Sequence, residues 1–293
     1  MGVRPTTLAG MRAALAGFET AEGFRKGLAF KPRPTDVFIS PYSKCGTTWM
    51  QQIVHGLRSG GDMSFSEITE AVPWIEMAHD LGLDPEVQRF KPRAYKSHLS
   101  WFDIPKGGRY IVVFRDPADA CLSLYKFFEG WFFETGSIRF EAFARDFYLG
   151  RGDDHGYWAH AASWWAQRDR DDVLLLCFED LKDDLPGAVR TVARFLNLPE
   201  SGPTFDIAVK QAGFDFMKAH GGQFDDHLVR ARRDAACGLP PGGSASKVSK
   251  GVAGAAKPIM SDETRAAFDA EWRRRMGEPF GLKDYAAIRA MLN

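Results

Sequence analysis

The residues with the clearest chemical potential lie together in the segment 43–49, whose sequence is SKCGTTW. This segment joins an apolar stretch at residues 36–40, which predicts a buried strand, to a predicted helix that starts at Thr47. A loop between a strand and a helix N-terminus directs backbone N–H groups and the positive end of the helix dipole toward one point. Lys44 adds a cation there, and Thr47 and Thr48 add hydroxyl groups. The segment therefore predicts a phosphate or sulfate site, although it is not a Walker A loop, in which the lysine follows the second glycine.

A second candidate anion ligand, Arg115, follows the apolar stretch at residues 109–114. The planar guanidinium group of arginine suits bidentate binding of a phosphate. Ser123 lies about two turns along the helix expected after this strand. Both side chains can reach one anion only if that helix folds back over the end of the strand. The alternative is that Arg115 forms a structural ion pair with Asp116 or Asp119.

His98, which follows a third predicted strand at residues 93–97, is the candidate general base. Imidazole titrates near neutral pH, so it can accept the proton of an attacking hydroxyl group. Lys96 adds a cation close by in the sequence. The alternative is a structural histidine at a strand end, and a structural role is expected for the other histidines, which are His55, His79, His155, His160, His220 and His227.

These candidate residues follow strands that alternate with helices. Strands are expected at residues 36–40, 93–97, 109–114 and 173–178, and helices at residues 47–57, 118–128 and 185–196. Apolar strands that alternate with helices predict a parallel sheet with helices on both faces, and ligands bind beyond the carboxyl ends of such strands. We therefore expect Lys44, His98 and Arg115 to converge.

The expected fold class is α/β, with residues 1–293 forming one domain. Residues 1–34 are expected to be an N-terminal extension with a weakly amphipathic helix at residues 8–18. Residues 238–257 are rich in Gly, Ser, Ala and Pro, which predicts a flexible loop. A last helix is expected at residues 261–276.

Composition narrows the classes of function. The chain has 38 Lys and Arg residues and 38 Asp and Glu residues, so it lacks the excess of positive charge that is typical of nucleic-acid-binding proteins. Its four cysteines form no CxxC pair, which predicts neither a zinc site nor a disulfide framework and favours a reducing, cytoplasmic location. No membrane span is expected, because no apolar stretch approaches about 20 residues. We also expect no metal cofactor.

The order and spacing of these motifs resemble those of the cytosolic sulfotransferases, whose donor is 3′-phosphoadenosine 5′-phosphosulfate (PAPS). The SKCGTTW segment is similar to the 5′-phosphosulfate loop of that family, with Cys45 in place of a serine. Residues 115–123 resemble the 3′-phosphate motif, and residues 96–99 resemble the segment that carries the general base. The resemblance extends from about residue 36 to residue 257.

Other segments match this family with substitutions. Phe178 stands where the family has a tyrosine, so any contact of that hydroxyl group with the nucleotide is lost. A later segment is similar to the one that encloses the adenine, and there Phe214, opposite Trp49, would sandwich the base. The glycine-rich segment that resembles the lid over the 3′-phosphate has Ser249 in place of an arginine. Lys247 is a candidate for the missing charge.

The resemblance implies a P-loop-like sulfotransferase fold and transfer of the sulfuryl group of PAPS to a hydroxyl group or, as a second choice, an amine. The nucleotide released would be adenosine 3′,5′-bisphosphate (PAP). The resemblance also implies that His98 is the general base, that Lys44 stabilises the leaving group and that Lys96 is a second catalytic cation. The residues expected to bind the nucleotide are Lys44, Cys45, Gly46, Thr47, Thr48, Trp49, Arg115, Ser123, Phe178, Phe214, Met217, Ser249, Lys250 and Gly251.

The acceptor is expected to be a small apolar or aromatic molecule. The residues expected to line its pocket are Trp74, Ile75, Trp131 and Phe132, together with Phe128 and Phe133. Two alternatives remain open, a non-catalytic protein that binds PAPS or PAP and an ATP-dependent kinase on a related α/β scaffold. The sequence leaves open the identity of the acceptor and the choice between a monomer and a homodimer.

Overall fold

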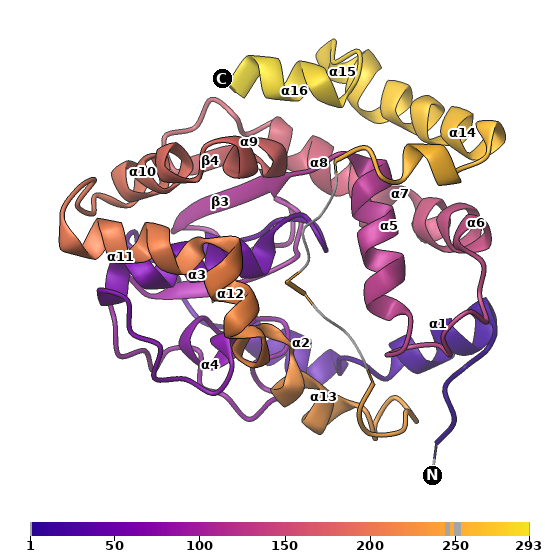
Figure 1. Ribbon diagram of the computed structural model, residues 1–293, viewed down its shortest axis with the longest axis horizontal. Helices are drawn as coiled ribbons and strands as arrows, with labels where there is room; N and C mark the ends of the chain where they lie inside the picture. Colours follow the sequence, from indigo (N-terminus) through magenta and orange to yellow (C-terminus); the bar gives the residue numbers. More distant parts are fainter. Residues whose placement is uncertain (1, 244–246, 249–252, 293) are drawn as a thin grey trace.

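The computed structural model describes residues 2–243, 247–248 and 253–292. At the centre of these residues is a sheet of four parallel strands in the order β2-β1-β3-β4 (Figure 1). The strands are β1 (Val37–Ile39), β2 (Ala94–Lys96), β3 (Arg109–Phe114) and β4 (Val173–Cys177). All four predicted strands are confirmed, with ends that differ from the prediction by at most one residue.

The alternation of side chains along the strands divides the hydrophobic core between the two faces of the sheet. In β3, Tyr110 and Val112 belong to one core, and Ile111 and Val113 belong to the other. The strand β1 pairs in parallel with both β2 and β3 in continuous register, so the same alternation carries across the sheet. Strands buried on both faces explain why their sequences are continuously apolar.

Helices cover both faces of the sheet, as the alternation of elements predicts. The first face packs against α3 (Thr47–Ser59), α10 (Leu185–Leu196), α11 (Pro203–Ala212) and α12 (Phe214–Ala219). The second face packs against α1 (Leu8–Ala16), α5 (Pro117–Phe128), α8 (Tyr157–Trp165), α14 (Asp262–Trp272) and α16 (Tyr285–Leu292). In Figure 1 the yellow C-terminal helices run along the top of the view, and α10, α11 and α3 lie on the left.

Shorter elements connect these helices. They are the α-helices α2 (Ala21–Gly27), α4 (Ile68–Ala71), α6 (Phe140–Ala142), α7 (Gly152–His155), α9 (Phe178–Asp183), α13 (His227–Arg233) and α15 (Glu278–Phe280). The 3-10 helices are η2 (Leu149–Arg151), η3 (Gly221–Phe224) and η4 (Lys257–Ile259), and the π-helices are η1 (Phe143–Tyr148) and η5 (Arg273–Gly277). The last predicted helix therefore ends as a π-helix, and the first, α1, is shorter than expected.

Local sequence explains the ends of the two helices that border the cavity described below. The Asp116 carboxylate caps α5 by accepting hydrogen bonds from the N–H groups of Ala118 and Asp119, and Pro117 occupies the first turn. The helix α3 ends at Gly60, which has a left-handed conformation with a φ of 68° that glycine adopts at little cost. The cap at Asp116 thus places the start of α5 directly after Arg115.

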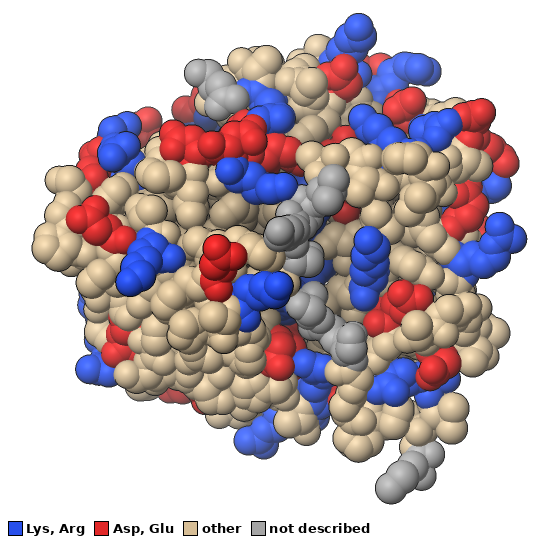
Figure 2. All heavy atoms as spheres, viewed as in Figure 1, with Lys and Arg blue, Asp and Glu red and all other residues tan. Residues whose placement is uncertain are grey.

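No helix in the described part of the chain is both long and apolar enough to cross a bilayer. Figure 2 shows Lys and Arg side chains interspersed with Asp and Glu side chains over one face of the molecule. This distribution agrees with the equal numbers of basic and acidic residues in the sequence. An anion-binding site on this scaffold must therefore depend on local charges.

Candidate active site

A cavity of about 960 Å³ is lined by residues that follow three neighbouring strands of the sheet. Lys44 follows β1, His98 follows β2 and Arg115 follows β3. From β1 the chain passes to one side to form β2 and then to the other side to form β3, so the cavity lies at the switch point of the sheet. The three candidate residues therefore meet at one cavity, as a parallel sheet predicts.

The loop after β1 has a backbone that suits an anion. Lys44 and Gly46 both have left-handed conformations, with φ values of 68° and 98°, and backbone turns of this kind form anion-binding concavities. Gly46 is the N-cap of α3 and provides no side-chain cap for the N–H groups of the first turn. The Oγ1 atom of Thr47 is buried without a hydrogen-bond partner. A Cβ atom at Gly46 would lie 3.1 Å from the Phe178 ring, so packing as well as φ favours glycine there.

Arg115 connects the end of β3 to this loop. Its side chain is buried, and its Nη1 atom donates a hydrogen bond to the carbonyl oxygen of Lys44 at 2.9 Å. The guanidinium group lies over the Phe178 ring, 4.4 Å from its centre. The Nε atom is buried and has no hydrogen-bond partner. Arg115 therefore supports the loop and keeps a donor for an anion.

The two acids that were alternative partners for Arg115 bond mainly to backbone donors. Asp116 caps α5, as described above. Asp119 is buried on the same helix and accepts hydrogen bonds from the N–H groups of Gly254 at 2.6 Å and Ala256 at 3.0 Å. Asp119 thus ties part of the glycine-rich segment to the helix that carries Ser123.

His98 lines the cavity, and neighbours fix both its ring and its backbone. Its ring Nδ1 atom lies 2.8 Å from the carbonyl oxygen of Pro41, and its backbone N–H group donates a hydrogen bond to Glu76 Oε1 at 2.7 Å. Because a carbonyl oxygen can only accept, Nδ1 carries the hydrogen and Nε2 keeps the lone pair. Burial, followed by the charge of Lys96, lowers the pKa of His98 to about 3. The imidazole is therefore neutral at physiological pH and can act as a base through Nε2.

Lys44 and Lys96 bring two ammonium groups to the cavity. Lys44 Nζ lies 4.1 Å from the centre of the Phe127 ring, and Lys96 Nζ lies 3.8 Å from the centre of the Trp74 ring. Burial, followed by the charge of Lys247, lowers the pKa of Lys44 to about 7 and that of Lys96 to about 8. Burial disfavours the charged form of a lysine and a neighbouring cation disfavours it further, so an anion bound beside these groups would stabilise their ammonium forms. The cavity therefore favours an anionic ligand.

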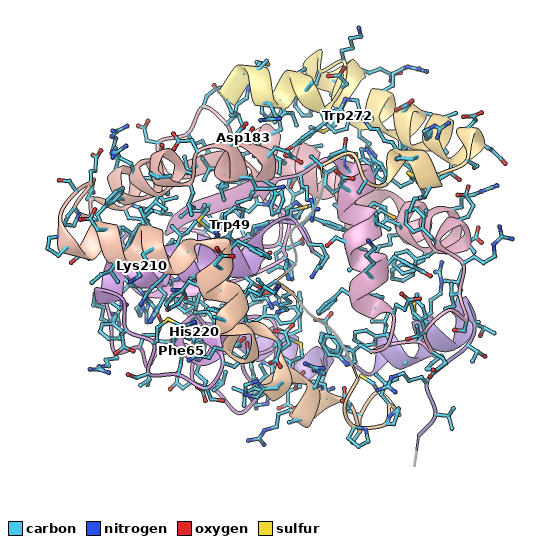
Figure 3. All side chains as sticks on the ribbon, viewed as in Figure 1. Trp49, Phe65, Asp183, Lys210, His220 and Trp272 are labelled. Carbon is cyan, nitrogen blue, oxygen red and sulfur yellow. The ribbon has the colours of Figure 1, made fainter. Side chains whose placement is uncertain are left out.

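The residues expected around an adenine base line the same cavity. They are Trp49 on α3 and Phe214 and Met217 on α12, and Figure 3 shows Trp49 near the centre of the molecule, beside these two helices. Trp49 Nε1 donates to the carbonyl oxygen of Ala212 at 2.8 Å, and its ring meets the Phe178 ring edge-on at 5.6 Å. An indole held in this way offers a fixed surface for a flat ring.

Aromatic side chains line the part of the cavity beside His98. The Trp74 ring meets the His98 ring edge-on, with centres 5.3 Å apart. Trp131 and Phe132 also line the cavity and stack on each other, with ring centres 4.5 Å apart. Trp131 Nε1 donates a hydrogen bond to Asp234 Oδ1 at 2.9 Å, which satisfies its one donor. The resulting apolar wall suits an aromatic or aliphatic ligand.

Ile75, expected in the acceptor pocket, is fully buried in the core and does not line the cavity. It lies in an extended segment that bridges to β2 through Trp74 and Lys96. Successive side chains of an extended segment point to opposite sides. Trp74 and Glu76 therefore face the cavity, and Ile75 faces the core.

The other predicted site residues divide into three groups. Cys45 and Phe133 are fully buried in the core rather than in the cavity lining, and burial raises the pKa of the Cys45 thiol to about 12. Ser249, Lys250 and Gly251 lie outside the described residues. The third group consists of predicted residues that do line the cavity, which are Gly46, Thr47, Thr48, Ser123, Phe128 and Phe178.

Several cavity residues escaped the sequence analysis. Glu76 lies in a segment whose direction depends on the bridge between Trp74 and Lys96, which no local pattern in the sequence predicts. His155 and His160 were expected to be structural, yet both line the cavity, and burial lowers the pKa of His160 to about 4. Asp226 belongs to none of the recognised motifs. Only the structure brings it to Lys247, with which it forms a buried ion pair.

Comparison with protein families identifies the kind of domain that this scaffold resembles. A family model described as the sulfotransferase domain matches residues 34–279. The chain is 27% identical over 259 residues to sulfotransferase 1B1 of Canis lupus familiaris, covering 84% of this chain and 85% of that protein. It is 25% identical over 268 residues to sulfotransferase 1C2 of Homo sapiens, covering 88% of each.

Solved structures share the fold. A retinol dehydratase in complex with androsterone and the inactive cofactor PAP matches with a TM-score of 0.68 at 20% identity, over 90% of this chain and 85% of that chain. Mouse sulfotransferase SULT7A1 complexed with PAP matches with a TM-score of 0.65 at 17% identity, over 88% of this chain and 90% of that chain. The predicted fold class, a parallel sheet with helices on both faces, is confirmed.

Proposed function

This chain belongs to the sulfotransferase family, and from that premise we propose that it transfers the sulfuryl group of PAPS to a small acceptor and releases PAP. The observation that carries the proposal is that Lys44, His98 and Arg115, which follow three different strands, line one cavity. A leaving-group cation, a base and a phosphate ligand are thereby available to one bound donor and one acceptor. The reacting group of the acceptor is a hydroxyl group or, as a second choice, an amine.

The residues at the nucleotide end of the cavity fit a donor with phosphate groups at two positions. Thr47 Oγ1 and Arg115 Nε are buried polar atoms without hydrogen-bond partners. An unpaired buried donor or acceptor costs about 1–3 kcal/mol, and an anion that bonds to these atoms removes that cost. We assign Thr47 and Thr48, with the start of α3, to the 5′-phosphate, and Arg115 and Ser123 to the 3′-phosphate.

The proposed mechanism follows from the groups that surround the reacting atoms. Bound PAPS supplies a sulfuryl group whose bond to the 5′-phosphate oxygen breaks, with the electron pair left on that oxygen, while the acceptor oxygen bonds to sulfur. His98 takes the proton of the acceptor hydroxyl at Nε2, the atom to which the contact with Pro41 leaves the lone pair. Lys44 donates to the oxygen that gains the electron pair, and Lys96 adds a second cation. Positioning and electrostatic stabilisation thus supply the catalysis, as in phosphoryl transfer.

We assign the acceptor to the aromatic part of the cavity. Trp74, which lies against the ring of His98, and Trp131 with Phe132 provide apolar contact area. A phenol or an alcohol with an apolar body would bury that body against these rings and leave its hydroxyl group near the base.

A screen of phenols, alcohols and amines with labelled PAPS tests the proposed function. Turnover is read out as a mass gain of one sulfuryl group on the acceptor together with release of PAP, and it supports the proposal. A protein that binds PAP without turning over any acceptor would instead be a non-catalytic binding protein. A kinase would turn over ATP with magnesium and leave PAPS intact.

A further inference from the structure

A buried ion pair joins Asp226 to Lys247 in the cavity that also contains Lys44 and Lys96. The side chain of Asp226 is 4% exposed and that of Lys247 is 9% exposed. Asp226 directly precedes α13 and has a left-handed backbone with a φ of 58°, which is uncommon for a residue other than glycine. A backbone conformation of this kind persists where the surrounding structure requires it. The ion pair is thus part of the cavity wall rather than a surface contact.

Three ammonium groups act on the Asp226 carboxylate. Lys44 Nζ and Lys247 Nζ lie 4.1 Å and 5.9 Å from the centre of the same Phe127 ring, so these two cations share one wall of the cavity. Burial opposes the ionisation of Asp226, but the charges of the three lysines outweigh burial and keep the pKa of Asp226 below its ordinary value. The Asp226 carboxylate is therefore a counter-ion of these lysines, and the charges of Glu67 and Glu76 also act on Lys96.

The position of Lys247 favours the sulfuryl end of the site over the 3′-phosphate end. Its ammonium group shares the Phe127 ring with that of Lys44, the residue assigned to the leaving oxygen. The positive charge of Lys247 also has a larger effect on the pKa of Lys44 than the positive charge of Arg115 has. Arg115 is the residue assigned to the 3′-phosphate. Lys247 is therefore better placed to meet the transferred group than to replace the arginine missing from the lid motif.

We propose that Lys247 is a third cation for the sulfuryl group, and that Asp226 is the residue that positions it. This inference rests on the proposed function. While the bond from sulfur to the 5′-phosphate oxygen breaks and the bond from the acceptor oxygen to sulfur forms, the electron pair goes to the phosphate oxygen beside Lys44. The acceptor proton goes to His98. Lys247 donates a hydrogen bond to a non-bridging sulfuryl oxygen throughout, and its own proton stays in place.

PAP provides the discriminating probe, because it has both phosphates of PAPS and lacks the sulfuryl group. A cation that binds the sulfuryl group contributes to the affinity for PAPS and to the rate of transfer, but not to the affinity for PAP. A cation that binds a phosphate contributes equally to both affinities. The ratio of the dissociation constants of PAP and PAPS therefore separates the two roles without knowledge of the acceptor.

The test compares Lys247→Met, Lys247→Arg and Asp226→Asn with the wild-type protein by calorimetric titration with PAP and with PAPS. We define the preference for PAPS as the ratio of the PAP dissociation constant to the PAPS dissociation constant. Lys247→Met should lower this ratio by about tenfold, the contribution of one charged hydrogen bond, and leave PAP affinity unchanged. With an acceptor found in the screen, it should lower kcat by about a hundredfold. Lys247→Arg should retain the preference, and Asp226→Asn should shrink it in part because the ammonium group is no longer held. Lys210→Met, the same substitution on the exposed face of α11, is the matched control.

Each outcome bears on one of the two proposals. Equal losses of PAP and PAPS affinity in Lys247→Met would overturn the assignment to the sulfuryl group, and so would an unchanged preference with unchanged kcat. An Asp226→Asn protein that keeps the wild-type preference would overturn the positioning role. A wild-type protein that binds neither nucleotide would contradict the proposed function itself, and the role of Lys247 would be rejected with it.

Discussion

The Nδ1 atom of His98 lies 2.8 Å from the carbonyl oxygen of Pro41, so the residue that follows β2 bonds directly to the loop that follows β1. This contact sets the tautomer of the imidazole and joins the candidate base to the loop that carries Lys44. Because β1 and β2 are neighbours in parallel register, the sheet itself fixes the spacing of the two loops. The candidate base and the candidate leaving-group cation are thus positioned by the sheet and its adjoining loops.

His98→Ala should abolish transfer and leave PAP binding intact. Loss of a general base lowers a rate by about a hundredfold to ten-thousandfold. Since burial keeps the pKa of His98 at about 3, the ring is neutral and adds no charge to the attraction of an anion. Initial rates with PAPS and PAP titration by calorimetry measure the two effects. The exposed His79→Ala is the control, and retained turnover in His98→Ala would refute the assigned role.

PAP binding should take up protons at neutral and mildly alkaline pH. Burial lowers the pKa of Lys44 to about 7 and that of Lys96 to about 8, so both side chains lose protons as the pH rises through this range. A bound anion favours the ammonium forms and raises both pKa values, so binding is linked to proton uptake. PAP affinity should therefore fall between about pH 7 and 9. Calorimetry in buffers with different ionisation enthalpies measures the uptake, and proton release would contradict the prediction.

Lys44→Ala should slow the chemical step far more than it weakens PAP binding. The lysine is assigned to the oxygen that gains the electron pair, where charge develops mainly in the transition state. Single-turnover rates with PAPS, set against PAP dissociation constants, separate the two effects. Equal losses in rate and affinity would indicate that Lys44 only binds the nucleotide.

Arg115→Ala should reduce the ability of the protein to distinguish PAP from adenosine 5′-phosphate, which lacks the 3′-phosphate. A hydrogen bond to a charged group contributes about 1.5–3 kcal/mol, so PAP affinity should fall by about tenfold or more while adenosine 5′-phosphate is affected less. Ser123→Ala should cause a smaller loss of the same kind. Because Arg115 also donates to the Lys44 carbonyl oxygen, equal losses for both nucleotides would show that it acts by supporting the loop.

The predictable part of this site consists of residues that lie within a few residues of a strand end. Short apolar runs before Lys44, His98 and Arg115 identify the strands, and parallel pairing brings their carboxyl ends to one edge of the sheet. The expected convergence follows from those two facts alone. Lys44 was predicted from its own loop motif, and its convergence with His98 and Arg115 follows from the parallel sheet.

The residues that sequence analysis misplaced depend on packing between distant segments. Ile75 was expected in the cavity and Glu76 was overlooked, because the side to which each points depends on the bridge between Trp74 and Lys96. Asp226 and Lys247 lie in segments without apolar periodicity, and no local pattern predicts that they form a buried pair. Such contacts are properties of the tertiary structure.

The buried ion pair between Asp36 and Arg93 should be required for the stability of the sheet around β1. Arg93 donates to Asp36 through Nε at 2.9 Å and Nη2 at 2.5 Å, and both side chains are 1% exposed. Asp36→Asn removes the buried counter-ion and leaves the guanidinium group only the half-exposed Glu86 at 3.5 Å, and loss of a buried partner costs about 3–5 kcal/mol. Urea denaturation should show a lower midpoint, whereas Glu22→Gln, which breaks an exposed pair with Lys26, should leave it unchanged.

Because neither residue of the buried pair lines the cavity, Asp36→Asn should still bind PAP well below its unfolding temperature. An unchanged midpoint would mean that the buried pair adds no net stability.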